Sequence, residues 1–113
     1  MNNLTKNLLM LNCVFGPNNR LIEEIDDYID LSEIENPKHL LDGLMDSGII
    51  DEKKTAGLSK FIDQERFDFF KTYIETENIG VCTVYDNTYP ERLRSIDDKP
   101  YVLYYKGSLE PLE

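Results

Sequence analysis

Residues 80–109 read GVCTVYDNTYPERLRSIDDKPYVLYYKGSL and carry the densest structural signals of this 113-residue chain. The residues after Gly80 are rich in Val, Thr and Tyr, which is typical of a largely buried strand. Tyr89-Pro90 sets an extended step, and Pro90 can open one short helix. Pro100 then restarts extended backbone, and the apolar run 101–105 predicts a second strand. The stretch therefore predicts a short β-α-β element.

The residues before this element are expected to be helical. The first helix is predicted by an apolar stripe at spacings of four, three and four, formed by Leu4, Leu8, Leu11 and Phe15. Gly16 ends that helix, Asn18 or Asn19 caps the next, and Asn36-Pro37 and Asp63 begin two others. Five short helices with brief connections predict a compact bundle over residues 1–78, with a junction near Gly80 and a second unit over 79–113. The side chains expected to face inward include Tyr28, Leu58, Phe61, Phe67, Phe70, Ile74, Leu93 and Ile96.

The charge of the chain is strongly acidic and unevenly distributed. The formal net charge is −10, from 22 acidic and 12 basic residues. Residues 1–78 hold 16 acids and 8 bases, a balance of −8, and the remaining 6 acids and 4 bases give −2. Affinity for nucleic acid comes largely from Lys and Arg that neutralise phosphates. We therefore expect the helical part to bind DNA poorly by itself.

Few residues indicate chemistry. The acidic face of the second predicted helix is interpreted as a solvated surface, formed by Glu23, Glu24, Asp26, Asp27 and Asp30. Cys13 and Cys82 lie in apolar surroundings and are predicted to be buried, inert thiols. His39 has no partner at metal-ligand spacing, so we expect neither a metal site nor a cofactor. Without a phosphate-binding glycine loop or a catalytic triad, the chain is predicted not to be an enzyme.

No stretch reaches the roughly 18 apolar residues of a membrane span, and no signal peptide is visible, so a cytoplasmic location without membrane contact is expected. The Gly16 turn is loosely similar to a helix-hairpin-helix turn that could offer backbone N–H groups to a phosphate. Only one glycine is present there and the following helix is acidic. A plain tight turn is therefore the favoured interpretation, with a nucleic-acid module as a further hypothesis.

Residues 79–109 resemble the approach to the nucleotide-fold domain of the DprA/Smf family of DNA-processing proteins. The family pattern is an apolar strand, Asp and Tyr-Pro, a Leu four residues after the Tyr, Asp-x-Pro, and an apolar strand that ends in Lys- or Arg-Gly. The matching residues are Asp86, Tyr89, Pro90, Leu93, Asp98, Pro100, Leu103, Tyr104, Lys106 and Gly107. The resemblance implies a sterile-alpha-motif or helix-hairpin-helix type of helical domain, followed by the start of a Rossmann-like domain.

The same resemblance implies a protein that binds incoming single-stranded DNA in natural transformation and helps to load the RecA recombinase. The family's DNA-binding signature is Gly-Ser-Arg, whereas this chain has Gly107-Ser108-Leu109. We therefore expect an N-terminal part of a longer protein that acts as an accessory or interaction module. The alternative is an acidic helical protein–protein adaptor unrelated to DNA, with a groove lined by residues such as Tyr28, Met45 and Phe70.

Two weaker expectations concern the surface of the second unit. Its basic residues could contact a phosphate through Arg92, Arg94 and Lys106, although solvated helix and loop positions are the favoured interpretation. The strand 101–105 would have an unpaired edge, and such an edge is a template for pairing with another chain. Self-association through this strand is therefore predicted.

Overall fold

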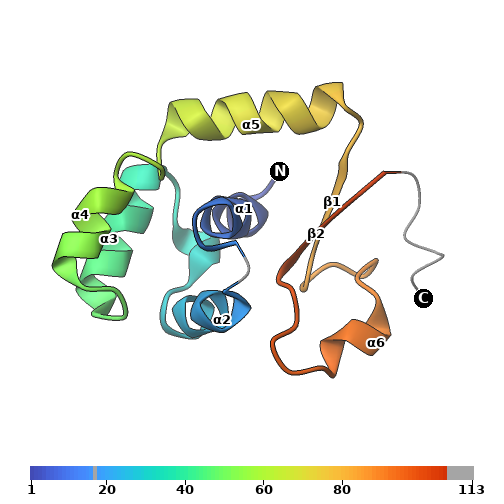
Figure 1. The fold of residues 1–113 in the computed structure, drawn as a ribbon, viewed down its shortest axis with the longest axis horizontal. Coiled ribbons are helices and arrows are strands. Elements are labelled where there is room, and N and C mark those ends of the chain that lie inside the picture. The colour runs from blue at the N-terminus through green and yellow to red at the C-terminus, as the bar shows by residue number, and fades with distance from the viewer. Residues whose placement is uncertain (17, 107–113) are drawn as a thin grey trace.

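The computed structural model describes residues 1–16 and 18–106 and is mainly helical, with one small sheet (Figure 1). This coarse fold class agrees with the sequence-based prediction. The elements are, in chain order, α1 (Asn3–Phe15), α2 (Asn19–Tyr28), the 3₁₀ helix η1 (Leu31–Glu33), α3 (Pro37–Ser47), α4 (Glu52–Leu58), α5 (Gln64–Thr76), β1 (Gly80–Thr83), α6 (Glu91–Arg94) and β2 (Val102–Tyr105).

Short polar side chains begin the five longer helices. The N-cap side chain of each accepts a hydrogen bond from a backbone N–H three residues later, which satisfies one of the free donors of the first turn. Asn18, Asn36 and Asp63 occupy these positions as predicted, and Pro37 follows Asn36 as the first residue of α3. Helix starts are therefore encoded locally in this chain.

Helix α1 lies at the centre of the molecule, with the other long helices and the sheet around it (Figure 1). The predicted stripe is only part of its buried surface: Leu9 and Met10 are buried as fully as Leu8 and Leu11. A helix that is apolar on most sides must have neighbours on most sides. Its contacts with α2, η1 and β2 provide them.

The two strands pair in antiparallel register, with Gly80 opposite Tyr105 and Cys82 opposite Leu103. The pair is therefore not a parallel crossover unit of the kind that builds a Rossmann sheet. Gly80, near which the junction was predicted, is the first residue of β1. A Cβ atom there would meet the Tyr105 ring at 2.3 Å, so the ring can lie over this position only because it is a glycine.

One hydrophobic core extends across the junction predicted near Gly80. Cys82, Val84, Tyr89 and Val102 of the C-terminal part belong to the same buried cluster as the leucines of α1. The helices and the two strands thus pack as one body in the described part of the chain.

Several side chains expected to face inward are exposed. Tyr28 is 66% exposed at the end of α2, and Ile96 is 47% exposed beyond the end of α6. Phe61 is 54% exposed because α4 ends at Leu58 and the turn that follows buries Ile62 instead. Cys13, expected to be buried, is also exposed, on the side of α1 that faces α5.

Candidate functional site

The turn after β1 is fixed by Asp86. Its carboxylate accepts hydrogen bonds from the Thr83 backbone N–H at 2.7 Å and from the Thr83 hydroxyl at 3.3 Å. Its carbonyl accepts from the backbone N–H of Tyr89 at 3.1 Å. An aspartate that binds nearby backbone in this way stabilises a turn without regular secondary structure. The Asp of the family-like pattern therefore holds the chain direction after β1.

Tyr89 links the two ends of the segment between the strands. Its side chain is 1% exposed, and its hydroxyl donates to the carbonyl of Pro100 at 2.7 Å. Pro90 directly precedes α6, and its carbonyl accepts from the Leu93 N–H at 3.0 Å. Leu93 packs against the core from α6. These four pattern residues thus define the path from β1 to β2.

Arg94 is at the centre of this segment. Its guanidinium donates to the carbonyl of Val84 and, at 2.8 Å, to the carbonyl of Asp86. The same group lies 5.1 Å from the centre of the Tyr89 ring, an arrangement typical of a cation–π contact. We call Val84, Asp86, Tyr89, Arg94 and Pro100 the Arg94 cluster.

The Arg94 cluster changes the interpretation of the predicted basic residues. Arg94 was interpreted as a solvated residue; its side chain is partly exposed, but its guanidinium donates to two backbone carbonyls. It also pairs with Glu91, whose carboxylate oxygen is 3.2 Å from Nε. Arg92 and Lys106 are exposed, at the start of α6 and just after β2. The structure therefore gives Arg94 a structural role.

Asp98, Leu103 and Tyr104 are the other pattern residues with a structural feature among the described residues. Asp98 has φ of 57°, in the left-handed region that aspartate tolerates better than most residues. Leu103 pairs with Cys82 in the sheet and packs against the core, and Tyr104 donates to Asn12 at 2.8 Å. Gly107 lies outside the described residues.

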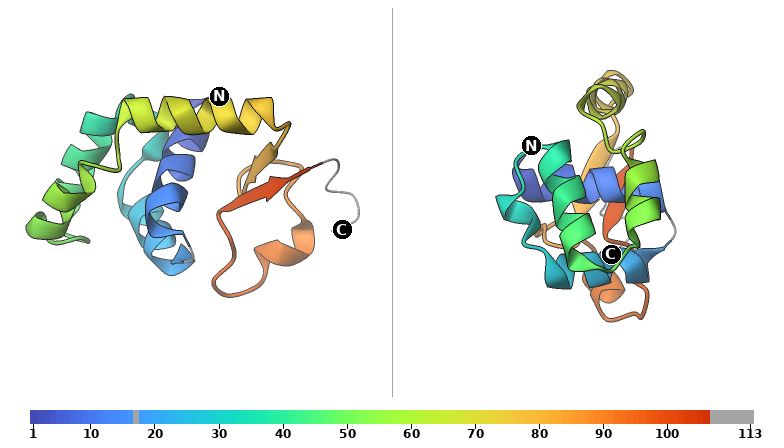
Figure 2. Two further views of the ribbon diagram at one scale, coloured as in Figure 1. Left: turned by 45° about the horizontal axis from the view of Figure 1, so that its top comes forward. Right: turned by 90° about the vertical axis from the view of Figure 1, so that its left-hand side faces the viewer.

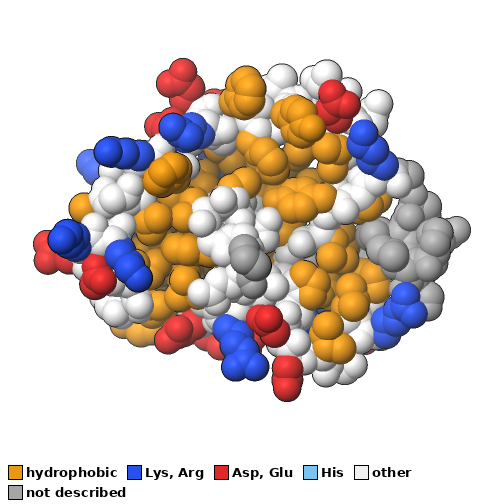
Figure 3. Space-filling view, in the orientation of Figure 1, with side chains coloured by type: hydrophobic (Ala, Val, Ile, Leu, Met, Phe, Trp, Pro, Cys, Tyr) orange, Lys and Arg blue, Asp and Glu red, His pale blue; other side chains and the backbone are white. Residues whose placement is uncertain are grey.

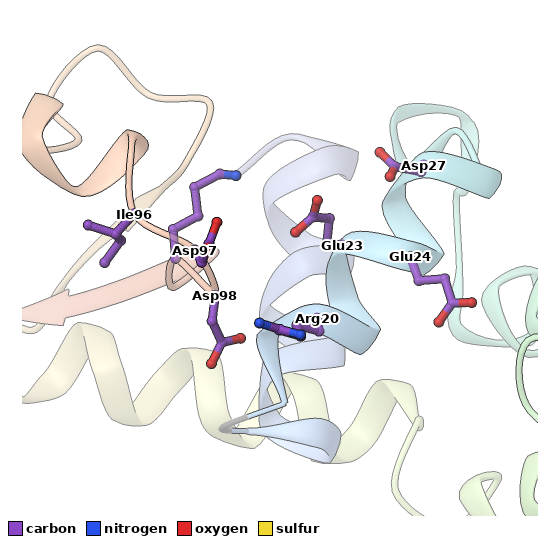
Figure 4. Close-up of a pocket in the computed structure, with 8 residues that line it drawn as sticks. Arg20, Glu23, Glu24, Asp27, Ile96, Asp97 and Asp98 are labelled. Carbon is purple, nitrogen blue, oxygen red and sulfur yellow. The ribbon is translucent and has the colours of Figure 1, made fainter.

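An acidic hollow of about 500 Å³ separates α2 from the loop between α6 and β2 (Figure 4). Five carboxylates and two basic groups line it, together with one apolar side chain: Arg20, Glu23, Glu24, Asp27, Ile96, Asp97, Asp98 and Lys99. In Figure 4 the Arg20 side chain extends toward Asp98. Because carboxylates predominate, the hollow disfavours a phosphate or another anion.

The acidic helix α2 also contacts the turn after β1 through one side-chain hydrogen bond. The Tyr85 hydroxyl donates to the Asp26 carboxylate. Burial raises the pKa of Asp26, and Asp27 and Asp30 raise it further, while the Tyr85 bond lowers it. Burial and the Asp26 carboxylate raise the pKa of Tyr85. The expected solvated acidic face is thus partly a packing surface.

The side-chain hydrogen bonds of Cys82 and His39 are to residues nearby in the sequence. Cys82 is buried as predicted, with its sulfur 3.4 Å from the Thr88 hydroxyl oxygen, and burial raises the pKa of its thiol. His39 is exposed, and its Nδ1 accepts from the Glu35 N–H at 3.4 Å. No group of three His, Cys, Asp or Glu residues in the described ranges could hold a metal ion. No helix there is long and apolar enough to cross a bilayer.

An apolar groove of about 210 Å³ lies between α1 and the first half of α5, with Phe61 also in its lining. Its lining residues are Met10, Cys13, Val14, Phe61, Arg66, Phe67 and Phe70. Of the residues named for an adaptor groove, Phe70 lines this one, while Tyr28 lines a separate hollow beside Tyr85. Met45 is 44% exposed on α3 and lines neither. Neither of these two hollows is lined by all three residues.

Two polar residues with structural roles were not found from the sequence. Asn7 is 1% exposed and donates to the carbonyls of Leu31 and Ile34, at 2.8 and 2.9 Å. The signal available was an Asn inside the apolar helix stripe, a position that requires hydrogen-bond partners when buried. Tyr85 carried no comparable signal, because its partner Asp26 is 59 residues away.

Comparison with protein-family models, with curated proteins and with solved structures finds no match for this chain.

Proposed function

We propose that this chain supplies the helical module and the first strands of a DprA/Smf-like DNA-processing protein. Its role there is to position the domain that binds single-stranded DNA, or to contact a partner such as RecA. The observation that carries the proposal is the Arg94 cluster. Asp86, Tyr89 and Pro100, three residues of the family-like pattern, are joined by hydrogen bonds into one unit with Arg94. Residues that occur at a fixed spacing and also contact one another are stronger evidence for a particular fold than isolated two-residue motifs are.

The charge distribution favours an accessory role over direct DNA binding. The net charge is −10, and the hollow beside α2 is lined mainly by carboxylates. The donors of Arg94 are directed at backbone carbonyls. The chain also lacks the Gly-Ser-Arg signature that the resemblance associates with DNA. Tight binding of a polyanion by this surface is therefore not expected.

A positioning role is supported by the contacts between the helices and the strands. Tyr104 of β2 donates to Asn12 of α1 and stacks edge-on against Phe70 of α5, with the ring centres 6.1 Å apart. Tyr85 binds Asp26 of α2. Because three helices contact the strand region, the helical module has a fixed orientation relative to β2. A domain that continues from β2 would inherit that orientation.

The first test measures binding of a fluorescently labelled oligo(dT) by anisotropy, in a salt titration that begins at low ionic strength. The chain alone should give no tight, salt-sensitive binding. Tight binding that weakens steeply with salt would contradict the accessory role.

The second test is genetic. Deletion of the gene should lower the recovery of recombinants when homologous single-stranded DNA is introduced into the organism that encodes the protein. Recovery of a replicating plasmid introduced in the same way is the control. Equal recovery of recombinants with and without the gene would overturn the proposed role in DNA processing.

A further inference from the structure

Helix α5 carries a second stripe beside its core face, and most of this stripe is exposed; only Phe70 also packs against the core. The core side of the helix is formed by Phe67 and Ile74, which are 6% and 4% exposed. On a neighbouring face Phe69 and Tyr73, four residues apart, are 78% and 52% exposed. Residues three and four apart lie on one side of a helix. The α5 stripe therefore comprises Arg66, Phe69, Phe70, Tyr73 and Glu77.

The position of α5 makes this stripe accessible. The helix lies along one edge of the molecule, and seen nearly end-on it projects above the rest of the body (Figure 2). Hydrophobic side chains gather along this side of the surface (Figure 3). The half-exposed Phe61 lies beside Arg66, whose guanidinium carbon is 5.5 Å from the centre of the Phe61 ring. Contiguous apolar surface of this kind marks an interaction site more often than isolated exposed residues do.

The α5 stripe has charges of opposite sign at its two ends. Arg66 lies in the first turn of α5, and Glu77 is the C-cap residue, whose N–H still donates to the carbonyl of Tyr73. The two positions are separated by about 16 Å along a helix. One end of the stripe is therefore basic, the other is acidic, and aromatic side chains lie between them.

We propose that a second copy of this chain covers the α5 stripe, with the two α5 helices antiparallel about a two-fold axis. When the axis passes between Lys71 and Thr72, Arg66 lies level with Glu77 of the second copy. In the same register Phe70 lies level with Tyr73 of the second copy. Each ion pair and each aromatic contact then occurs twice, which is the self-complementarity that a two-fold interface requires.

Electrostatics favour this approach direction over others. The chain carries a net charge of −10, so two copies repel each other in most orientations. The acidic helix α2 lies on the opposite side of the molecule from α5 (Figure 1). The stripe itself carries one positive and one negative residue. Contact through α5 therefore keeps the two acidic helices far apart, and antiparallel α5 helices also place their dipoles in the favourable orientation.

The experiment measures the mass of the intact chain by light scattering and sedimentation equilibrium over a wide concentration range. The expected result is a reversible dimer of twice the 13.2 kDa chain mass. Tyr73→Asp should shift the chain to a monomer, because it places a carboxylate at an apolar contact that occurs twice. Arg66→Glu and Glu77→Arg should each raise the dimer Kd about tenfold, since both copies lose an attractive pair and gain a repulsive one.

The decisive variant is the double reversal Arg66→Glu/Glu77→Arg, which should restore the dimer Kd to near its original value. Glu75→Arg is the matched control: it makes the same charge change on an exposed residue of α5 outside the stripe. The varied residues Arg66, Tyr73, Glu75 and Glu77 are all exposed. Circular dichroism checks that each variant remains folded. A strict monomer at every concentration would overturn the proposal. So would a dimer unaffected by Tyr73→Asp, which would indicate association through β2 instead. The inference does not depend on the proposed role in DNA processing.

Discussion

The phenol of Tyr89 donates a 2.7 Å hydrogen bond to the carbonyl oxygen of Pro100, eleven residues later in the chain. The donor residue Tyr89 is 1% exposed, and the acceptor residue Pro100 is half-buried. The bond closes the segment that contains α6, so that β2 begins at a fixed distance from the end of β1. The segment between β1 and β2, which resembles the family pattern, is thus stabilised by Tyr89, a residue of that pattern.

Tyr89→Phe should lower the free energy of unfolding by about 1 kcal/mol, because it removes this bond and leaves the Pro100 carbonyl without its donor. The ring and its contact with Arg94 remain. Urea denaturation followed by circular dichroism measures the effect. Tyr28→Phe is the control, since Tyr28 is 66% exposed and should lose almost nothing. Equal stability of Tyr89→Phe and the original chain would contradict a structural role for the bond.

Arg94→Lys should cost about 1–3 kcal/mol, because an ammonium cannot donate to two carbonyls in the planar geometry that a guanidinium provides. The affected acceptors are the carbonyls of Val84 and Asp86. Arg92→Lys, two residues away on the same helix and exposed, makes the same chemical change and should be neutral within the error of denaturation experiments. Similar losses for the two variants would show that the Arg94 cluster contributes no specific stability.

Asn7→Ala should destabilise the chain by about 2–3 kcal/mol, because the buried carbonyls of Leu31 and Ile34 would lose their donor. Asn3→Ala is a matched control on the same helix. Asn3 donates to the Ser32 carbonyl at a longer 3.4 Å and near the surface, so its loss should cost less than about 0.5 kcal/mol. Thermal and urea unfolding of both variants would rank the two bonds. A larger loss for Asn3→Ala would contradict the assignment of Asn7 as the buried anchor of η1.

Asp26→Asn should stabilise the chain slightly at neutral pH, by less than about 1 kcal/mol. Burial raises the pKa of Asp26, so ionisation of this carboxyl costs more in the folded than in the unfolded chain. The asparagine oxygen can still accept from Tyr85. The gain should vanish as the pH falls below the ordinary pKa of aspartate, where both states of the original chain are protonated. Asp46→Asn, at an exposed position of α3, controls for the change in net charge.

The local signals in the sequence predicted the ends of elements well and the faces of elements less well. Asn18, Asn36 and Asp63 cap helices because capping involves residues only three apart. Phe61 and Ile62 show the limit. Both are apolar neighbours in a turn after α4, and only the tertiary packing decides that Ile62 is buried and Phe61 is exposed.

The sequence pattern named several residues of the Arg94 cluster, but it did not predict which hydrogen bonds they would form. The pattern selected Asp86, Tyr89 and Pro100, and hydrogen bonds connect these three residues in the structure. The role of Arg94 depends on carbonyls eight and ten residues earlier, which reach it only because the turn after β1 reverses the chain. The contact of Tyr85 with Asp26 joins residues 59 apart. Spacing along the sequence does not encode such contacts.

Alkaline pH should destabilise the chain through its buried tyrosines, and Tyr101 allows the clearest test. Burial, reinforced by Glu23 and Asp26, raises the pKa of Tyr101 to about 12. An unfolded tyrosine ionises near ~10, so between these values the unfolded chain releases a proton that the folded chain retains. The contribution of Tyr101 to stability is therefore complete below pH ~10 and is lost as the pH rises toward 12.

Tyr101→Phe keeps the ring under Lys99 and removes the ionisable group, so its free energy of unfolding should fall less steeply across that pH range. Urea denaturation at a series of alkaline pH values measures the slope, and the exposed Tyr28→Phe variant provides the comparison. Parallel slopes for Tyr101→Phe and the original chain would place the alkaline sensitivity on other groups. The remaining candidates are Tyr85, Tyr89 and Tyr104, whose pKa values are also raised by burial.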